Sequence, residues 1–418
     1  MRYEIQLPDN KSLKIRRMVL AYVRGAEIPP VSDKDARDVR VTWRALQTIR
    51  EASSETCRGA SPQTGKTYAP PVVVDVADCG AAYRFLMPVL AATSGTWLLT
   101  GTPRLLQRPV LPLVEALRGA GAGIERVGDG WLIQGRTVET LRATSLQRGG
   151  NETDHDNAGG FSLTLDASQS SQMASALVMA APLLNLRTLQ LTTTDIPSLS
   201  YLRMTLALAR DWPVVIPGLE VPDTPIGAPG DWSAALFWFA HARLHPENEY
   251  RLSPLSLESI QGDSVVARWF DEMNVSVSCG DARPCVSTDP CIDISAKPLE
   301  EMPRMALDVR DNLDTVPVMA ALAALLPADI TFQNVRNLRF KESDRLAALA
   351  EQLAPYAEIE LSDNVLRVCG RGGPITPSAA FNTHHDHRLA MAFLLFPGAL
   401  LDDVGCLEKS YPGLLEQI

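Results

Sequence analysis

The densest group of charged residues in this 418-residue chain lies at positions 337–345, in the order Asn-Leu-Arg-Phe-Lys-Glu-Ser-Asp-Arg. Apolar residues recurring from position 346 onward predict that the group leads into an amphipathic helix. Lys341 and Arg345 would lie four residues apart on that helix, where like charges repel by a few tenths of a kcal/mol. An anion between the two side chains would remove this penalty. The segment therefore predicts an anion-binding site, with a solvated run of charges as the alternative.

Other polar residues stand where the chain could hold an anion. Lys11 and Arg16 lie at the start of a predicted helix, and Arg104 and Arg108 follow a strand end beside Pro and Gly. Arginine is suited to capturing a carboxylate or phosphate through two parallel hydrogen bonds. Residues 166–172 open another predicted helix, and successive hydroxyl and N–H groups at a helix N-terminus form an anion site. Simple helix capping would explain one serine there but not the whole polar run.

Three further patterns suggest different chemistry. Residues 60–67 match a permissive phosphate-binding loop, but neither flank provides the strand and helix that such a loop needs, so a surface loop is favoured. Residues 384–388 hold three histidines and an aspartate, which could suggest a metal, although adjacent ligands on one turn seldom converge. Cys279, Cys285 and Cys291 lack a C-x-x-C step, which favours reduced thiols over zinc.

The composition limits the class of protein. Apolar residues make up 46% of the chain and charged residues 21%, which is typical of a folded globular protein. The net charge of −10 argues against nucleic-acid binding, which needs a basic surface. The sequence shows neither an apolar run long enough for a membrane span nor the pattern of a signal peptide. We therefore expect a cytoplasmic monomer that gathers positive charge at one site for an anionic substrate.

One structural pattern recurs along the chain: an amphipathic helix, a break of small residues, then short strands. It is found near residues 113–134, 265–287 and 345–368, and the third copy is the clearest. A few copies at irregular spacing indicate repeated α/β units rather than a solenoid. Proline and glycine concentrate at residues 222–230, which predicts a boundary between two halves. Residues 24–75 show weak periodicity and are left unassigned.

Taken in order, these segments resemble the 5-enolpyruvylshikimate-3-phosphate synthases over nearly the whole chain. Residues 7–16 resemble the opening LPGSKSxxNR of that family, and residues 78–84 its loop GNAGTAxR. Residues 100–109 resemble TGxxxxxxRP. Residues 337–345 match NxRxKExDR, and residues 386–391 match DHRxAM.

The resemblance implies roles for residues at the matching positions. The residues expected to bind phosphoenolpyruvate are Lys11, Gly80, Arg108, Arg345, Arg388 and Lys409. The residues expected to bind shikimate 3-phosphate are Ser12, Arg16, Ser170, Ser171, Gln172, Ser198, Tyr201, Asp314, Asn337 and Lys341. Asp314 and Glu342 would act as acid and base, with Lys11 as a possible proton donor.

The resemblance also implies an α/β fold with two globular halves built from repeated βαβαββ units and an active site in the cleft between them. The C-terminal half would comprise residues 1–10 plus 231–418, and the N-terminal half residues 11–230. The implied reaction transfers the enolpyruvyl group of phosphoenolpyruvate to the 5-hydroxyl of shikimate 3-phosphate, a step of the shikimate pathway of aromatic amino-acid biosynthesis. No metal and no organic cofactor is expected, because side chains supply the electrostatic stabilisation.

The sequence departs from the family pattern at four positions. Asp78 and Ala81 stand where the family has Asn and Thr, and Asp9 and Asn10 stand where it has Gly and Ser. Extra carboxylates near an anion site would weaken affinity, so a non-catalytic shikimate-phosphate-binding relative is the alternative function. The related UDP-N-acetylglucosamine enolpyruvyl transferases use a reactive cysteine in a loop that residues 102–109 do not reproduce.

Overall fold

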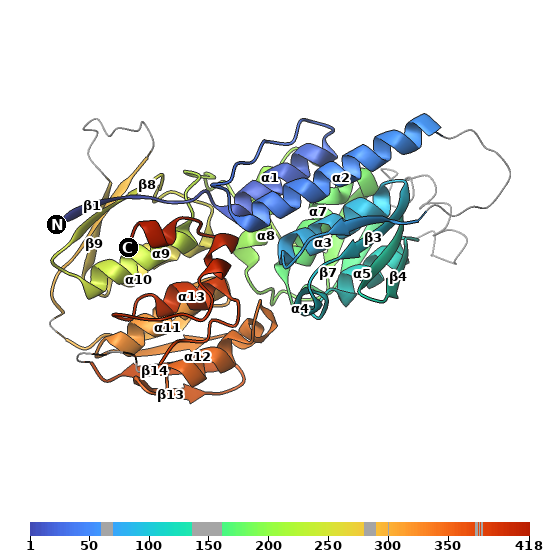
Figure 1. Cartoon of the computed structure of the whole chain (residues 1–418). Helices are drawn as coiled ribbons and strands as arrows, with labels where there is room; N and C mark the ends of the chain where they lie inside the picture. The colour runs from blue at the N-terminus through green and yellow to red at the C-terminus, as the bar shows by residue number, and fades with distance from the viewer. Residues whose placement is uncertain are drawn as a thin grey trace. The chain divides into compact units, whose positions relative to one another are not determined.

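The computed structural model describes residues 1–59, 70–135, 161–279, 290–299, 301–372, 375, 377 and 379–418 (Figure 1). The chain forms two compact units. The first comprises Met1–Lys11, Lys34–Arg37 and Thr224–Ile418, and the second comprises Ser12–Asp33 and Asp38–Asp223. The loop at residues 60–67 and Cys285 lie outside the described residues. No helix in the described part of the chain is long and apolar enough to cross a lipid bilayer.

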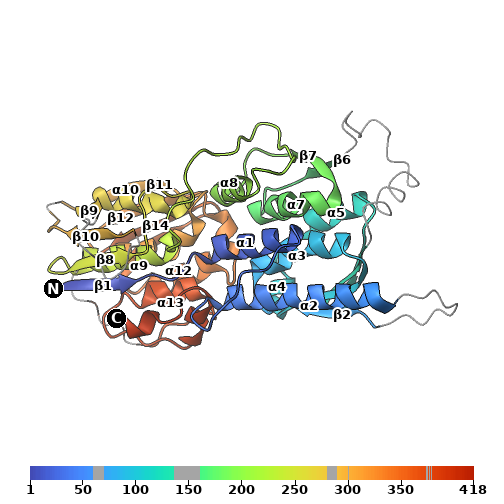
Figure 2. The same cartoon turned by 90° about the horizontal axis from the view of Figure 1, so that it is seen from above.

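Three four-stranded sheets share one topology, in which two parallel strands lie beside an antiparallel pair. A helix precedes the second and the third strand of each sheet, so all three are βαβαββ units, as predicted. The second unit contains the sheet β2-β3-β5-β4, and the first contains β11-β12-β14-β13 and β1-β8-β10-β9. Strand β1 of the last sheet comes from the N-terminus and lies beside β8 (Figures 1 and 2).

The elements of the first unit have the following bounds: β1 Arg2–Gln6, α9 Trp232–Leu244, β8 Glu249–Ser253, η2 Gly262–Val265, α10 Val266–Asp271, β9 Val275–Cys279, β10 Ile292–Ala296, β11 Arg304–Asp308, η3 Leu313–Thr315, α11 Val316–Leu325, β12 Asp329–Gln333, η4 Arg336–Phe340, α12 Arg345–Leu353, β13 Ala357–Leu361, β14 Val365–Gly370, α13 His387–Phe393, η5 Gly405–Lys409 and η6 Leu414–Glu416, where η marks a 3-10 helix.

Among its described residues, the second unit holds one complete βαβαββ unit and one shorter pair of parallel strands, β6 and β7. Its elements have the following bounds: α1 Lys11–Val23, α2 Arg37–Gly59, β2 Val72–Asp75, α3 Gly80–Ala92, β3 Gly95–Thr100, α4 Pro103–Leu106, α5 Leu111–Gly119, β4 Gly123–Val127, β5 Gly130–Gly135, β6 Phe161–Leu165, α7 Ser171–Leu184, β7 Leu186–Leu191 and α8 Leu199–Leu208.

The centre of each unit is filled by helices in which almost every residue is buried. Nine consecutive residues of α11, from Val316 to Ala324, are buried. Helix α11 packs against α9 and α13. In the other unit α3 packs against α7, as Figure 2 shows. A helix without a polar face must lie inside a core, so these sequences place their helices centrally. Packing therefore holds the N-terminal ends of such helices in place, and functional residues at those ends have well-defined positions.

Helix α2 lies in the region that the sequence left unassigned. Val39, Leu46 and Ile49 are buried and recur at helical spacing along one face. The remaining faces carry Thr, Ser and charged residues, and the preceding segment is rich in Pro. These neighbours dilute the apolar signal, which is why periodicity alone missed the helix.

Two glycines at the ends of strands occupy equivalent places in their sheets. Gly135 ends β5 and Gly370 ends β14, each the third strand across its sheet. A Cβ atom at either position would overlap two backbone carbonyl oxygens at the C-terminal end of the first helix of that unit. The oxygens belong to Leu90 and Thr93 of α3 and its cap, and to Ala323 and Leu326 of α11 and its cap. Only glycine fits in this close approach of strand to helix.

We predict that Gly135→Ala and Gly370→Ala each lower the free energy of unfolding by roughly 1–3 kcal/mol, because the backbone must shift to admit a methyl group. Urea denaturation followed by circular dichroism measures the effect. Gly119→Ala is the matched control: a Cβ there meets no atom within 4 Å. Equal urea midpoints for Gly135→Ala and Gly119→Ala would contradict the steric argument.

Candidate active site

A buried arginine organises the polar centre of the first unit. Arg345 is 1% exposed, and four hydrogen bonds join it to three carboxylates. Nε and Nη2 hold both oxygens of Asp386 at 2.8 and 3.1 Å, Nη1 donates to Asp314 at 2.9 Å, and Nη2 donates to Glu342 at 2.8 Å. Guanidinium offers five N–H donors, so one N–H of Nη1 is left beyond these four bonds. The group therefore acts mainly as the fixed centre around which three carboxylates are placed.

Asp314 lies among three cations. Its Oδ1 accepts from Lys341 Nζ at 3.1 Å and from Arg345, and its Oδ2 lies 3.6 Å from Arg388 Nη2. Burial alone would raise the pKa of this carboxyl group, but Lys341, Arg388 and Arg345 outweigh burial and hold the pKa well below its usual range. Asp314 is consequently an ionised acceptor at neutral pH.

The helix predicted to carry both Lys341 and Arg345 begins only at Arg345, where Asp344 caps it. Lys341 lies before the helix, so the predicted helical spacing of the two cations is wrong. A carboxylate of the protein itself lies between them, since Oδ1 of Asp314 accepts a hydrogen bond from each. A protein carboxylate from a distant part of the chain thus relieves the repulsion.

Lys11 starts α1, and its Nζ lies 3.4 Å from Nε2 of His387. His387 is 2% exposed, and burial together with the charges of Lys11 and Arg388 holds its pKa well below its usual range. The imidazole is therefore neutral and can accept a hydrogen bond from the ammonium group, with its proton on Nδ1, 3.8 Å from Asp386 Oδ1. The Asp-His-Arg motif was recognised from the sequence, but only Arg388 was predicted to have a role, and Asp386 and His387 were not.

The other histidines of that motif do not converge with His387. His384 and His385 are exposed and adopt left-handed backbone conformations. The hydrogen bond from Nδ1 of His385 to Asp403, 2.7 Å long, raises the pKa of His385. Among the residues that the structure describes, no group of three or more His, Cys, Asp or Glu side chains is placed to hold a metal.

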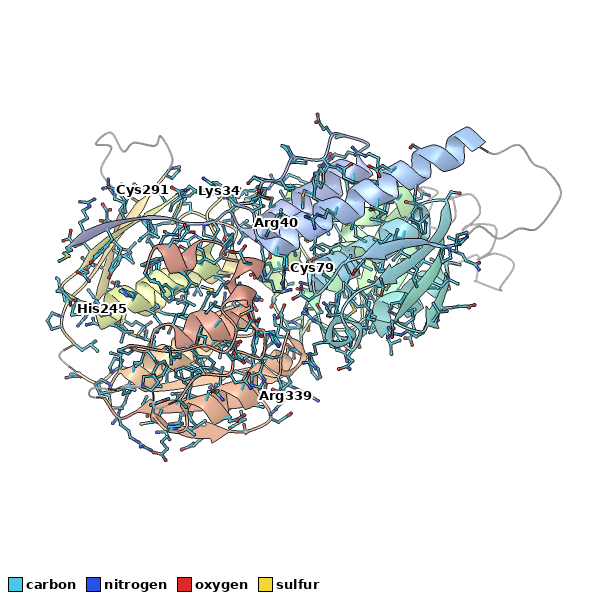
Figure 3. The ribbon with its side chains drawn as sticks, viewed as in Figure 1. Lys34, Arg40, Cys79, His245, Cys291 and Arg339 are labelled. Carbon is cyan, nitrogen blue, oxygen red and sulfur yellow. The ribbon has the colours of Figure 1, made fainter. Side chains whose placement is uncertain are left out.

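Two more candidates of the first unit lie on 3-10 helices. Lys409 is fully buried at the end of η5, which packs against α13, the helix that carries Arg388. Asn337 is half-buried on η4, shortly before Lys341. Arg339, whose position Figure 3 shows, makes an ion pair with Asp344.

In the second unit, Arg16 is buried on α1. Its Nε donates to Thr205 Oγ1 at 2.7 Å and its Nη1 to the carbonyl oxygen of Ser12 at 2.9 Å. The guanidinium carbon lies 5.0 Å from the ring centre of Phe85 and 5.6 Å from that of Tyr201. Burial lowers the pKa of Arg16 to about 10, so it remains charged at neutral pH. Among the described residues Nη2 has no hydrogen-bond partner, which suits an anionic ligand.

Gly80, the first residue of α3, packs directly against Arg108. A Cβ atom on Gly80 would lie 2.7 Å from Cζ of Arg108, so a larger residue would displace the guanidinium from this position. The helix is capped by Cys79, whose Sγ accepts from Ala82 N at 3.4 Å (Figure 3). Arg84 is buried one turn further and donates to Gln172 Oε1 at 2.9 Å. Arg84 therefore orients Gln172, one of the predicted ligand-binding residues.

The remaining candidates lie at the starts of α7 and α8, two helices that pack together. Ser170 caps α7 by accepting a hydrogen bond from the backbone N–H of Gln172, and Ser171 is buried beside it. Ser198 precedes α8 with φ 56°, a left-handed conformation that is uncommon for serine, and its side chain makes no cap hydrogen bond. Tyr201 follows one turn later. Each predicted residue thus lies on a helix start, where backbone N–H groups favour anions.

We predict that Arg345→Met lowers the free energy of unfolding by about 3–5 kcal/mol at pH 7.5, because buried carboxylates lose their counter-charge. The depressed pKa of Asp314 means that its pairing stabilises the fold above the unfolded pKa, about 4, and that this contribution is lost as the pH falls below it. In the variant the carboxyl pKa values rise, so protonation makes the penalty smaller at pH 5. Urea unfolding at the two pH values measures this.

The half-buried pair of Arg367 with Asp329 provides the control, since Arg367→Met removes an ion pair that solvent still reaches. That variant should lose little stability at either pH. A penalty for Arg345→Met that is the same at pH 5 and pH 7.5 would contradict the electrostatic explanation.

Comparison with known proteins identifies the family of this chain. The family model EPSP synthase (3-phosphoshikimate 1-carboxyvinyltransferase) matches residues 2–418. A 3-phosphoshikimate 1-carboxyvinyltransferase from Bacteroides fragilis is 29% identical over 432 residues, covering 99% of this chain and 94% of that protein. One from Yersinia pseudotuberculosis is 29% identical over 443 residues, with the same coverage of 99% and 94%. A solved EPSP synthase from Acinetobacter baumannii shares the fold, with a TM-score of 0.63 and 19% identity, covering 100% of this chain and 94% of that one. The chain belongs to the EPSP synthase family.

Proposed function

We propose that this protein transfers the enolpyruvyl group of phosphoenolpyruvate to the 5-hydroxyl of shikimate 3-phosphate and releases phosphate. Membership of the EPSP synthase family supports the reaction. The observation that carries it to this chain is Asp314, an ionised carboxylate surrounded by Lys341, Arg345 and Arg388. That arrangement combines a proton acceptor with the fixed positive charge that two anionic substrates need.

Asp314 takes the proton of the attacking hydroxyl in this proposal. Its low pKa keeps it ionised, and hydrogen bonds from Lys341 and Arg345 fix its Oδ1. As the hydroxyl oxygen bonds to the central carbon of phosphoenolpyruvate, a proton must reach the methylene carbon. Glu342 and Lys11 are the candidates for that transfer. Elimination of phosphate then removes a proton from the new methyl group, so the same residues act in reverse.

Cations of both units are assigned to the phosphate and carboxylate groups. In the first unit Lys11, Arg388, Lys409 and the remaining N–H of Arg345 are proposed for phosphoenolpyruvate. In the second unit Arg108, seated on Gly80, is proposed for the same ligand. Arg16, with its unpartnered buried Nη2, is proposed for shikimate 3-phosphate. The further residues proposed for that substrate are Ser12, Ser170, Ser171, Gln172, Ser198, Tyr201, Asn337 and Lys341.

The test is phosphate release from phosphoenolpyruvate by the purified chain, measured with and without shikimate 3-phosphate. Asp314→Asn keeps the shape and the acceptor oxygen but cannot take a proton, so we expect turnover to fall by roughly 100-fold or more while both substrates still bind. Asp329→Asn, which alters an ion pair on sheet β11-β12-β14-β13, should leave turnover unchanged. Near-normal turnover for Asp314→Asn would rule out its role as base. Binding of shikimate 3-phosphate without turnover in the unmodified chain would instead favour a non-catalytic relative.

Asp78 provides a second test, because it stands where the family has Asn. It lies in the turn between β2 and α3, two residues before Gly80. A carboxylate about 4 Å from another anion repels it by roughly 1 kcal/mol in water and roughly 4 kcal/mol at an intermediate dielectric constant. We predict that Asp78→Asn lowers the KM for phosphoenolpyruvate and that the effect shrinks as salt rises. An unchanged or higher KM, or a loss of thermal stability, would show that Asp78 serves the helix start instead.

A further inference from the structure

Next to Lys11 and Asp314, the first unit holds a group of buried polar side chains to which the proposed chemistry assigns no role. Each member is at most 7% exposed, and two are carboxylates. The members are Asn10, Asp231, Ser233, Gln261, Asp263 and Asn312. Polar groups this deep in a core are costly unless they bind one another, so the pattern of their hydrogen bonds is informative.

One end of the group fixes the backbone that leads into Lys11. The amide nitrogen of the Asn10 side chain donates to Asp231 Oδ1 at 3.1 Å and to Gln261 Oε1 at 2.8 Å. The backbone N–H of Asn10 donates to Pro229 O at 2.7 Å. A side-chain amide has two N–H donors for these two acceptors, whereas the serine of the family pattern has only one O–H donor. This departure of the sequence therefore strengthens the attachment of the segment before Lys11.

The other end fixes the turn that carries Asp314. Asp263 accepts a hydrogen bond from Ser233 Oγ at one oxygen and from Asn312 Nδ2, at 3.3 Å, at the other. Asn312 precedes the 3-10 helix η3, and its carbonyl oxygen accepts from Thr315 Oγ1 at 2.6 Å. Asp263 thus holds the residue from which this short helix starts.

Ser233 joins the two ends. Its backbone N–H donates to Asp231 Oδ1 at 2.9 Å while its hydroxyl donates to Asp263. The hydrogen bonds are therefore continuous from Asn10, beside Lys11, to Asn312, two residues before Asp314. Burial, reinforced by the charge of Asp314, raises the pKa of Asp263 to about 6. Buried carboxylates are weak evidence for stability, so a role in fixing geometry is the hypothesis to test.

We propose that Asp263 is a positioning residue for the reaction: it fixes the turn that carries Asp314 and, through Ser233 and Asp231, ties that turn to Asn10 and Lys11. This inference rests on the function proposed above. Two groups that exchange protons with one substrate must keep a constant separation, and a misplacement of about 1 Å can cost roughly 100-fold in rate. A rigid network of buried hydrogen bonds provides that constancy.

The experiment measures kcat and both KM values for two substitutions of Asp263. Asp263→Ala removes both acceptors, and we expect kcat to fall about 10- to 100-fold with each KM within about threefold of its original value. Asp263→Asn retains an oxygen for Asn312 and an N–H for Ser233, and should recover most of the lost kcat. Recovery by the amide separates hydrogen-bond geometry from the loss of charge.

Two further variants keep the test sharp. Tyr250→Phe is the control for a lost hydrogen bond in the same unit, since Tyr250 binds His241 at 2.7 Å in strand β8, and it should lower thermal stability without changing kcat. If Asp263→Ala does not fold, Ser233→Ala removes a single donor and should give a smaller fall in kcat. In the double variant Asn10→Ala, Asp263→Ala, the combined loss should be smaller than the product of the single losses, because one network is broken twice.

Three outcomes would overturn the inference. Unchanged kcat in Asp263→Ala and Ser233→Ala, with an active unmodified chain, would show that the network serves stability alone. A loss of kcat in Asp263→Ala that Asp263→Asn fails to recover would show that charge, not positioning, is what matters. An unmodified chain with no turnover of the two substrates would overturn the proposed function together with this inference.

Discussion

A charged guanidinium group enclosed in a protein core needs carboxylates around it, and Arg345 obtains them from three separate parts of the chain. Glu342 comes from the segment before α12, Asp314 from the turn before α11, and Asp386 from the cap of α13. Because each carboxylate stands at the start of a helix, neutralising one charge fixes the starts of three helices together. The apolar helices supply the core, but the buried charge determines how their polar ends meet.

The same constraint assigns protonation states. Asp314 stays ionised because cations surround it, while His387 stays neutral because it is buried beside Lys11 and Arg388. One side chain can then accept a proton and the other can orient an ammonium group without competing for it. In the second unit, the buried Arg16 has different partners from Arg345: two aromatic rings and a threonine contact its guanidinium. No carboxylate is among these contacts, so the positive charge there is not neutralised by them.

The sequence predicted those parts of the molecule that depend on local pattern. The repeated α/β unit followed from periodicity, and the cationic candidates followed from motifs with fixed spacing. What the sequence could not supply were contacts between distant segments. Asp386 lies 41 positions from Arg345, and Asn10 lies 221 positions from Asp231, so no local pattern relates them. The helix does begin at Arg345, but the helical spacing assigned to Lys341 was wrong, because a run of charges does not reveal which acidic residue becomes the cap.

The contacts of Gly135 and Gly370 show that the two ends of helices α3 and α11 serve different purposes. Helix α3 bears Gly80 at its first residue and α11 follows the 3-10 helix of Asp314, so residues proposed for the chemistry lie at the N-terminal end of each. The glycines press against the opposite, C-terminal ends. The steric demand there is independent of substrates. Finding the same contact in two sheets shows that the demand comes from how a βαβαββ unit packs its third strand across the sheet against its first helix.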